Sequence, residues 1–121
     1  MSVEMLRYVI AGFLVIHGIG HIGGYWMFVK SWLSPALTDS PLKWLFVVMW
    51  LGAMFGFFAA GIGLFQMNGW WRTWAIAASA ISLVVSVLYI QGAAFNAAVA
   101  DAVILVSLLL LRWPSAELVG S

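Results

Sequence analysis

The sequence predicts an all-α integral membrane protein, folded as an antiparallel bundle of four transmembrane helices. Of its 121 residues, 65% are hydrophobic and 7% are charged, and the mean hydropathy is +1.10. A soluble domain of this size cannot hide so many apolar residues. Four apolar runs, each near the roughly 20 residues that cross a hydrocarbon core, are separated by short polar or helix-breaking segments. We therefore expect a single membrane domain over residues 1–121.

The first predicted helix covers residues 6–28 (LRYVIAGFLVIHGIGHIGGYWMF). Its apolar stretch is too long for the core of a secretory signal, and two histidines interrupt it, so we interpret it as a retained membrane helix. Glu4 and Arg7 are three residues apart at its start and are expected to pair at the membrane edge. Residues 29–43 contain two prolines and several polar residues, which predicts an exposed loop.

The second predicted helix covers residues 44–65 and ends at the turn-forming segment 66–69 (QMNG). The third covers residues 71–90 and the fourth residues 93–111. The connection between them is so short that they should form an antiparallel hairpin. We expect Asn96 to serve this turn by satisfying backbone groups.

Small residues predict where the first two helices touch. Gly20 and Gly24 form a GxxxG pair in the first helix, and Gly52 and Gly56 form another in the second. Ala60 extends the second pair by one turn. Such pairs let two helix backbones approach closely, so we expect the helices to pack through them.

Basic and aromatic residues predict how the bundle lies in the bilayer. Three arginines (Arg7, Arg72, Arg112) lie on the side of the two termini, and two lysines (Lys30, Lys43) lie on the other. By the positive-inside rule this favours cytoplasmic termini. Aromatic residues near the predicted helix ends are interpreted as interfacial anchors: Tyr25, Trp26, Trp32, Trp44, Trp70, Trp71, Tyr89 and Trp113. A net charge of +1 without a basic cluster offers no binding surface for nucleic acid.

A polar layer is predicted near the bilayer centre. His17 and His21 lie one helical turn apart in the first helix, where ionisable groups are costly and usually face the protein interior. With about 1.5 Å of rise per residue, His17 lies near the midplane, His21 roughly 6 Å outward and Asp101 about 1.5 Å outward. Ser82 lies about 2 Å and Trp50 roughly 7 Å outward on the same arithmetic. All four helices therefore contribute to one candidate cofactor-binding site.

Several chemistries suit this layer. His17, His21 and Asp101 can form a metal site of two imidazoles and a carboxylate with an open position. One histidine can be the axial ligand of a haem or chlorin. A histidine paired with a carboxylate can also donate a proton to a quinone. These readings predict a redox-associated membrane protein, whereas two histidines are too few for a membrane di-iron hydroxylase.

The alternative is that the layer only holds the bundle together. A histidine bonded to Asp101 would then fix the first helix against the fourth, as side-chain hydrogen bonds do in other membrane proteins. The chain would be a non-catalytic accessory subunit of a larger membrane complex. Because it has little mass outside the bilayer, we expect partners, either further copies or other membrane subunits, under both hypotheses.

Four short segments resemble small bacterial four-helix membrane proteins, broadly those that are DoxX-like. They are HGIGH at 17–21, WLGAMFGFFAAGIGLF at 50–65, NGWWR at 68–72 and AFNAAVADAVIL at 94–105. The resemblance implies a four-helix fold in a bacterial or archaeal cytoplasmic membrane. Some members of the group are similar to subunits of quinone-linked sulfur oxidation, and most have no assigned activity. Whether this chain is an enzyme is left open by the resemblance.

Overall fold

The computed structural model describes residues 1–30, 41–89 and 95–121, and these ranges contain helices and no strand. The helices are α1 (Val3–Lys30), α3 (Leu42–Phe65), α4 (Trp71–Tyr89), α5 (Phe95–Leu105), the π-helical turn η2 (Val106–Leu110) and α6 (Ala116–Val119). The predicted all-helical class is confirmed. Helices were also predicted at the right places, to within three residues at every end that can be compared. Most of the predicted loop at 29–43, Trp32 included, and the third connection lie outside the described residues. The surroundings of Gly24 and the side chains of Tyr25, Trp26 and Tyr89 also lie outside the description.

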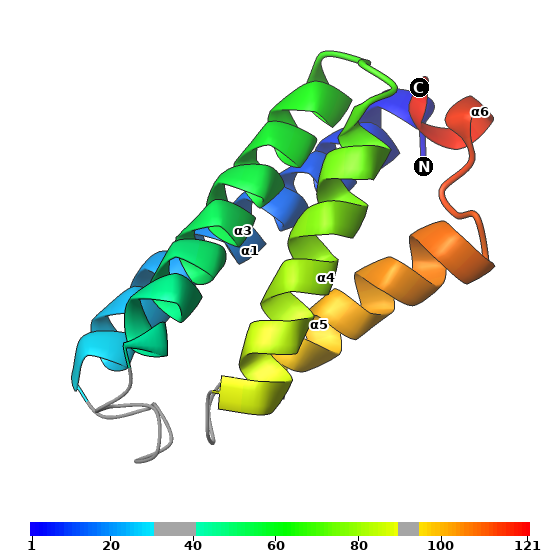
Figure 1. Cartoon of the computed structure of the whole chain (residues 1–121). Coiled ribbons are helices and arrows are strands. Elements are labelled where there is room, and N and C mark those ends of the chain that lie inside the picture. Colours follow the sequence, from blue (N-terminus) through cyan, green and yellow to red (C-terminus); the bar gives the residue numbers. More distant parts are fainter. Residues whose placement is uncertain (31–40, 90–94) are drawn as a thin grey trace.

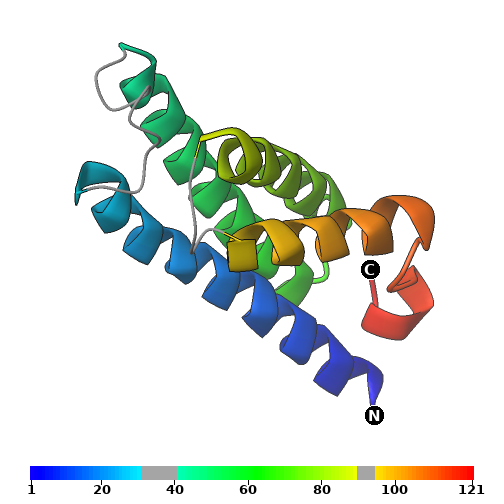
Figure 2. The same ribbon diagram turned by 90° about the horizontal axis from the view of Figure 1, so that it is seen from below.

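The helices pack in chain order, α1 against α3, α3 against α4, and α4 against α5. They alternate in direction, and α5 leans away from the other three (Figure 1). Figure 2 shows α5 running obliquely to α1. These two helices make few direct contacts, so the bundle has an open seam between them. We call this the α1–α5 seam.

Two of the helices, over Val3–Gly23 and Trp44–Phe65, are long and apolar enough to cross a membrane by length and composition. The apolar stretches Trp71–Val87 and Phe95–Leu110 are shorter. The core lies where α1, α3 and α4 meet. One stripe of α3, spaced by three or four residues, is fully buried there: Ala53, Phe57, Ala60 and Leu64.

None of the three predicted glycines that can be examined makes the predicted contact between the first two helices. A Cβ atom added to Gly20 or Gly52 would meet nothing within 4 Å. Gly56 is tightly packed, but its added Cβ would lie 2.8 Å from the Cβ of Ala78 on α4, which is not the predicted partner helix. The α1–α3 contact therefore uses other glycines.

The close approach of α1 and α3 occurs at Gly18 and Gly61. A Cβ added to Gly61 would lie 2.6 Å from Cγ2 of Val15, and one added to Gly18 would lie 2.7 Å from the ring of Phe58. Gly20 is two residues beyond Gly18, about 200° around the helix, so the two glycines cannot face the same neighbour. Gly20 and Gly24 have the GxxxG spacing, but Gly20 does not lie on the face of α1 that contacts α3.

The terminal segment 115–121 folds back onto the start of α1 and α4, so both termini lie at one end of the molecule (Figure 1). Gly120 has a left-handed φ of 86°, and a Cβ there would come within 3.2 Å of Nη1 of Arg7. Arg7 is buried beneath this segment and lies 5.2 Å from the Tyr8 ring centroid. The predicted ion pair with Glu4 is not formed in the described structure, and the burial of Arg7 explains its absence.

Trp71 is also held by the terminal segment. Its indole Nε1 donates a hydrogen bond to the main-chain oxygen of Ser121 over 3.2 Å, and Nη2 of Arg72 donates to the same oxygen over 3.0 Å. Trp71 is buried, so its assignment as an exposed anchor was wrong. Three other predicted anchors are exposed: Trp44, Trp70 and Trp113.

Candidate functional site

His17 on α1 and Asp101 on α5 link their helices across the seam. Nε2 of His17 lies 2.7 Å from Oδ1 of Asp101. An ionised carboxylate only accepts hydrogen bonds, so with Asp101 charged the proton lies on Nε2 of His17. Asp101 is fully buried, and the His17 side chain is 12% exposed. Oδ2 of Asp101 has no hydrogen-bond partner among the described residues.

His21 is satisfied inside the bundle. Its Nδ1 donates to the main-chain oxygen of His17 over 2.9 Å, because a carbonyl can only accept. Its Nε2 therefore accepts from the hydroxyl of Ser82 on α4, also over 2.9 Å. Trp50 on α3 donates from Nε1 to the main-chain oxygen of His21 over 2.9 Å, and the two rings lie 4.1 Å apart between centroids. Both ring nitrogens of His21 are thus engaged by the protein.

Aromatic side chains fix the ring of His17. Phe57 meets it edge-on with centroids 4.5 Å apart, and Phe13 is parallel to it at 6.1 Å. Phe13 precedes His17 by one helical turn, and this spacing is the only feature of the sequence that could have indicated that the two rings are neighbours. Sequence reasoning missed both phenylalanines because nothing distinguishes them from the other aromatic residues of these apolar helices.

The structure brings the five predicted residues together, one or two from each helix. His17 contacts Asp101, while His21 contacts Ser82 and Trp50. The histidines are adjacent, with ring centroids 5.2 Å apart. The predicted levels of these residues relative to one another therefore agree with which of them meet, whereas the depth of the layer in a bilayer and what the layer binds stay predictions.

A metal ion does not fit this arrangement. Among the described residues, no three His, Asp or Glu side chains are placed to hold one. The physical reason is that His21 uses both nitrogens within the bundle and His17 uses Nε2 on Asp101, so the three side chains do not converge on a common point.

A cavity of about 260 Å³ lies beside the two histidines; we call it the histidine cavity. It is lined by His17, Gly20, His21, Trp50, Asn96 and Ala97. Gly20 leaves space here because it has no side chain and no close neighbour. Asn96, predicted to serve a turn, belongs to this lining. The volume is below the roughly 300–1,000 Å³ of pockets that enclose drug-sized ligands, so it does not fit a haem or chlorin.

Two further serines extend the polar face of α4. Ser79, Ser82 and Ser86 are spaced by three and four residues, and all three are buried. The hydroxyls of Ser79 and Ser86 have no hydrogen-bond partner among the described residues, in contrast to that of Ser82. This contrast allows a matched test of the His21 hydrogen bond.

Ser82→Ala is expected to lower the free energy of unfolding by about 1–3 kcal/mol, since it leaves the buried Nε2 of His21 without a donor. Ser79→Ala makes the same chemical change on the same helix but removes an unpaired hydroxyl, so it should cost nothing. Denaturant unfolding of the two variants in the same detergent measures the difference. Equal stabilities would show that the Ser82–His21 bond contributes little.

No family model, curated protein or solved structure matches this chain. The likeness to DoxX-like proteins therefore stays a prediction.

Proposed function

We propose that this chain is a membrane protein that binds a lipid-soluble ligand in the histidine cavity, where His17 forms a hydrogen bond with a ligand oxygen. The head group of a quinone is the class that suits the site best. Asp101 would orient the His17 ring through Nε2 and leave Nδ1 to the ligand. Nδ1 would donate to a carbonyl oxygen when it carries a proton, and accept from a hydroxyl when it does not.

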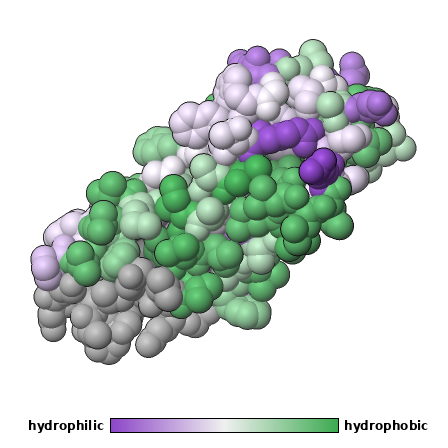
Figure 3. Space-filling model, turned by 45° about the vertical axis from the view of Figure 1, so that its right-hand side comes forward, coloured by the Kyte–Doolittle hydropathy of each residue, from purple (hydrophilic) through white to green (hydrophobic). Residues whose placement is uncertain are grey.

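Membrane residence is supported by the surface. Large apolar side chains are exposed on every long helix, with examples in Ile16, Val48, Phe55 and Val87. Figure 3 shows apolar residues over the middle of one face and hydrophilic residues gathered at one end. Soluble monomers rarely expose apolar areas of this extent. We further propose that the end with the termini is cytoplasmic, because Arg7, Arg72 and Arg112 belong to it.

One observation carries the ligand proposal. His17 lines the histidine cavity, and no hydrogen bond to its Nδ1 is formed within the described residues, whereas Nε2 is held by buried Asp101. A histidine with one nitrogen oriented by a carboxylate and the other available is suited to proton exchange with a ligand. Trp50 and Ala97 give the same cavity apolar walls.

An accessory role is the second candidate. The His17–Asp101 bond joins two helices that otherwise make few contacts, which is what a purely structural link would do. The chain would then assemble with further copies or with other membrane subunits, and the histidine cavity would bind nothing. The two candidates differ in whether blocking the cavity has a consequence.

The test uses a benzoquinone head group without a side chain, added to protein extracted from membranes. We expect Gly20→Leu to weaken binding at least tenfold, because the new side chain enters the cavity without meeting another group. Gly12→Leu is the matched control, since Gly12 lies on the same helix, is equally unobstructed and does not line this cavity. His17→Gln should weaken binding about tenfold, or about 1.4 kcal/mol, through loss of one hydrogen bond.

Equal binding by the wild type, Gly20→Leu and His17→Gln would overturn the ligand proposal. Failure of all folded forms to bind, together with recovery of the protein only in a larger assembly, would support the accessory role. Binding is measured by quenching of tryptophan fluorescence and by native mass spectrometry of the same samples.

A further inference from the structure

We propose that the ligand of the histidine cavity carries one apolar chain, and that this chain lies in a second cavity farther along the α1–α5 seam. The proposal rests on the proposed function and adds the shape of the ligand to it. Its basis is that two neighbouring cavities differ in their linings: the histidine cavity has polar groups, and the second cavity is apolar.

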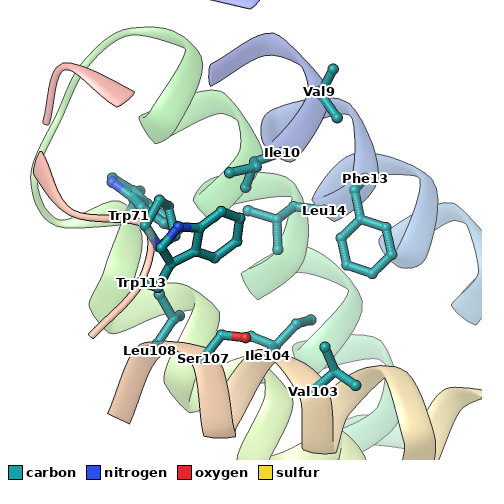
Figure 4. A pocket seen from close by; sticks show the side chains of 11 residues that line it. Val9, Ile10, Phe13, Leu14, Trp71, Val103, Ile104, Ser107, Leu108 and Trp113 are labelled. Atoms are coloured by element: carbon teal, nitrogen blue, oxygen red, sulfur yellow. The ribbon is translucent and has the colours of Figure 1, made fainter. Parts of the chain in front are cut away.

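The second cavity, here called the chain cavity, has a volume of about 250 Å³. Figure 4 shows side chains of α1 facing side chains of α5 and η2 across it, with Trp71 and Trp113 at one end. Ile10 and Leu14 belong to one wall and Ile104 and Ser107 to the other. The surface of the lining is apolar throughout. An apolar cavity of about 150 Å³ already holds a benzene molecule, so this one has room for a longer hydrocarbon segment.

The two cavities lie on either side of the His17–Asp101 pair. On α1, Phe13 and Leu14 of the chain cavity precede His17 by about one turn, and Gly20 of the histidine cavity follows it by about one turn. On α5, which runs in the opposite direction, Ile104 follows Asp101 and Ala97 precedes it. A ligand bonded to His17 therefore has the chain cavity about one helical turn away along α1, on the other side of the pair.

Phe13 connects the two regions. Its side chain lines the chain cavity, and its ring lies parallel to that of His17, with the planes at 2°. A flat head group beside His17 and a chain beside Phe13 would thus share one continuous aromatic wall.

The chemistry of the walls selects the ligand class. The histidine cavity offers imidazole and amide groups to a carbonyl or hydroxyl, whereas the chain cavity offers only apolar contacts. No lysine or arginine of the described residues lines either cavity, so these residues offer no cation to a phospholipid head group. The geometry points to a neutral head group with a single hydrocarbon or isoprenoid chain.

The experiment compares two probes with the same benzoquinone ring, one without a side chain and one with a decyl chain. Ser107→Phe fills the chain cavity, and we expect it to raise the Kd of the decyl probe at least tenfold without changing that of the bare ring. Leu109→Phe is the matched control, because Leu109 lies on η2 but does not line the cavity. Gly20→Leu should weaken both probes.

Unchanged binding of the decyl probe by Ser107→Phe, with loss of both probes in Gly20→Leu, would overturn the chain proposal and leave the proposed function intact. Unchanged binding in both variants would overturn the two proposals together. Val103→Phe replaces Ser107→Phe if that variant does not fold, since Val103 lines the same cavity and is half exposed.

Discussion

His17→Leu is expected to lower the free energy of unfolding by about 3–5 kcal/mol, because it leaves a buried carboxylate without its hydrogen-bonded partner. The variant leaves the fully buried Asp101 with neither oxygen bonded to any described residue, since Oδ2 is already without a partner. Asp101→Leu should cost less, because the remaining His17 can be neutral and is partly exposed. Unfolding in detergent, followed by circular dichroism, measures both losses.

The double variant His17→Leu/Asp101→Leu is the control for this experiment. Replacing both members of a buried pair by apolar residues is often neutral or stabilising, so the double variant should be more stable than His17→Leu alone. A double variant as unstable as the sum of the single changes would mean that the two side chains act independently. The link between α1 and α5 would then have to come from other contacts.

Gly61→Ala is expected to lower the free energy of unfolding by about 1–3 kcal/mol, the usual cost of overpacking a core. The added methyl group would lie 2.6 Å from Val15 and 3.0 Å from the main-chain oxygen of Ala11. Because Ala11 offers backbone rather than a flexible side chain, α1 and α3 must move apart to admit the methyl group.

Gly52→Ala is the matched change on the same helix. Its added methyl group meets nothing within 4 Å, so the better helix propensity of alanine should stabilise the protein by roughly 0.5–1 kcal/mol. Thermal unfolding of the two variants should therefore move in opposite directions. Similar changes in both would show that the α1–α3 contact is looser than the distances indicate.

The level of each polar residue could be predicted because an α-helix rises by a constant amount per residue. Once the ends of four apolar runs are known, the levels of His17, Asp101 and Ser82 follow by counting, and the structure places them in contact. Helix positions were predictable for the same reason, since hydropathy marks the ends of each run.

The direction of each side chain around its helix could not be predicted. In α1 and α3 almost every residue is apolar, so the sequence has no polar face from which the buried face can be inferred. For this reason Gly20 and Gly52 were assigned to contacts that Gly18 and Gly61 make. For the same reason the sequence did not show that the His21 ring faces Ser82 and not a point shared with His17 and Asp101.

Contacts of the terminal segment were unpredictable for a different reason. Trp71 and Arg72 bind an oxygen that is about 50 residues away along the chain. This oxygen lies beyond the four predicted helices, so counting residues along a helix could not place it. The burial of Arg7 beneath Gly120 was unpredictable for the same reason.

The α1–α5 seam also separates the molecule into two parts that differ in how firmly they are held. Helices α1, α3 and α4 form a continuous block, while α5 is attached along one side through α4. It is linked to α1 by the His17–Asp101 hydrogen bond and by apolar packing around Ile104. Displacing α5 breaks one helix interface, whereas unfolding the block breaks two. Local opening and global unfolding therefore have separate free energies, and α5 is the element that can move while the rest of the protein keeps its shape.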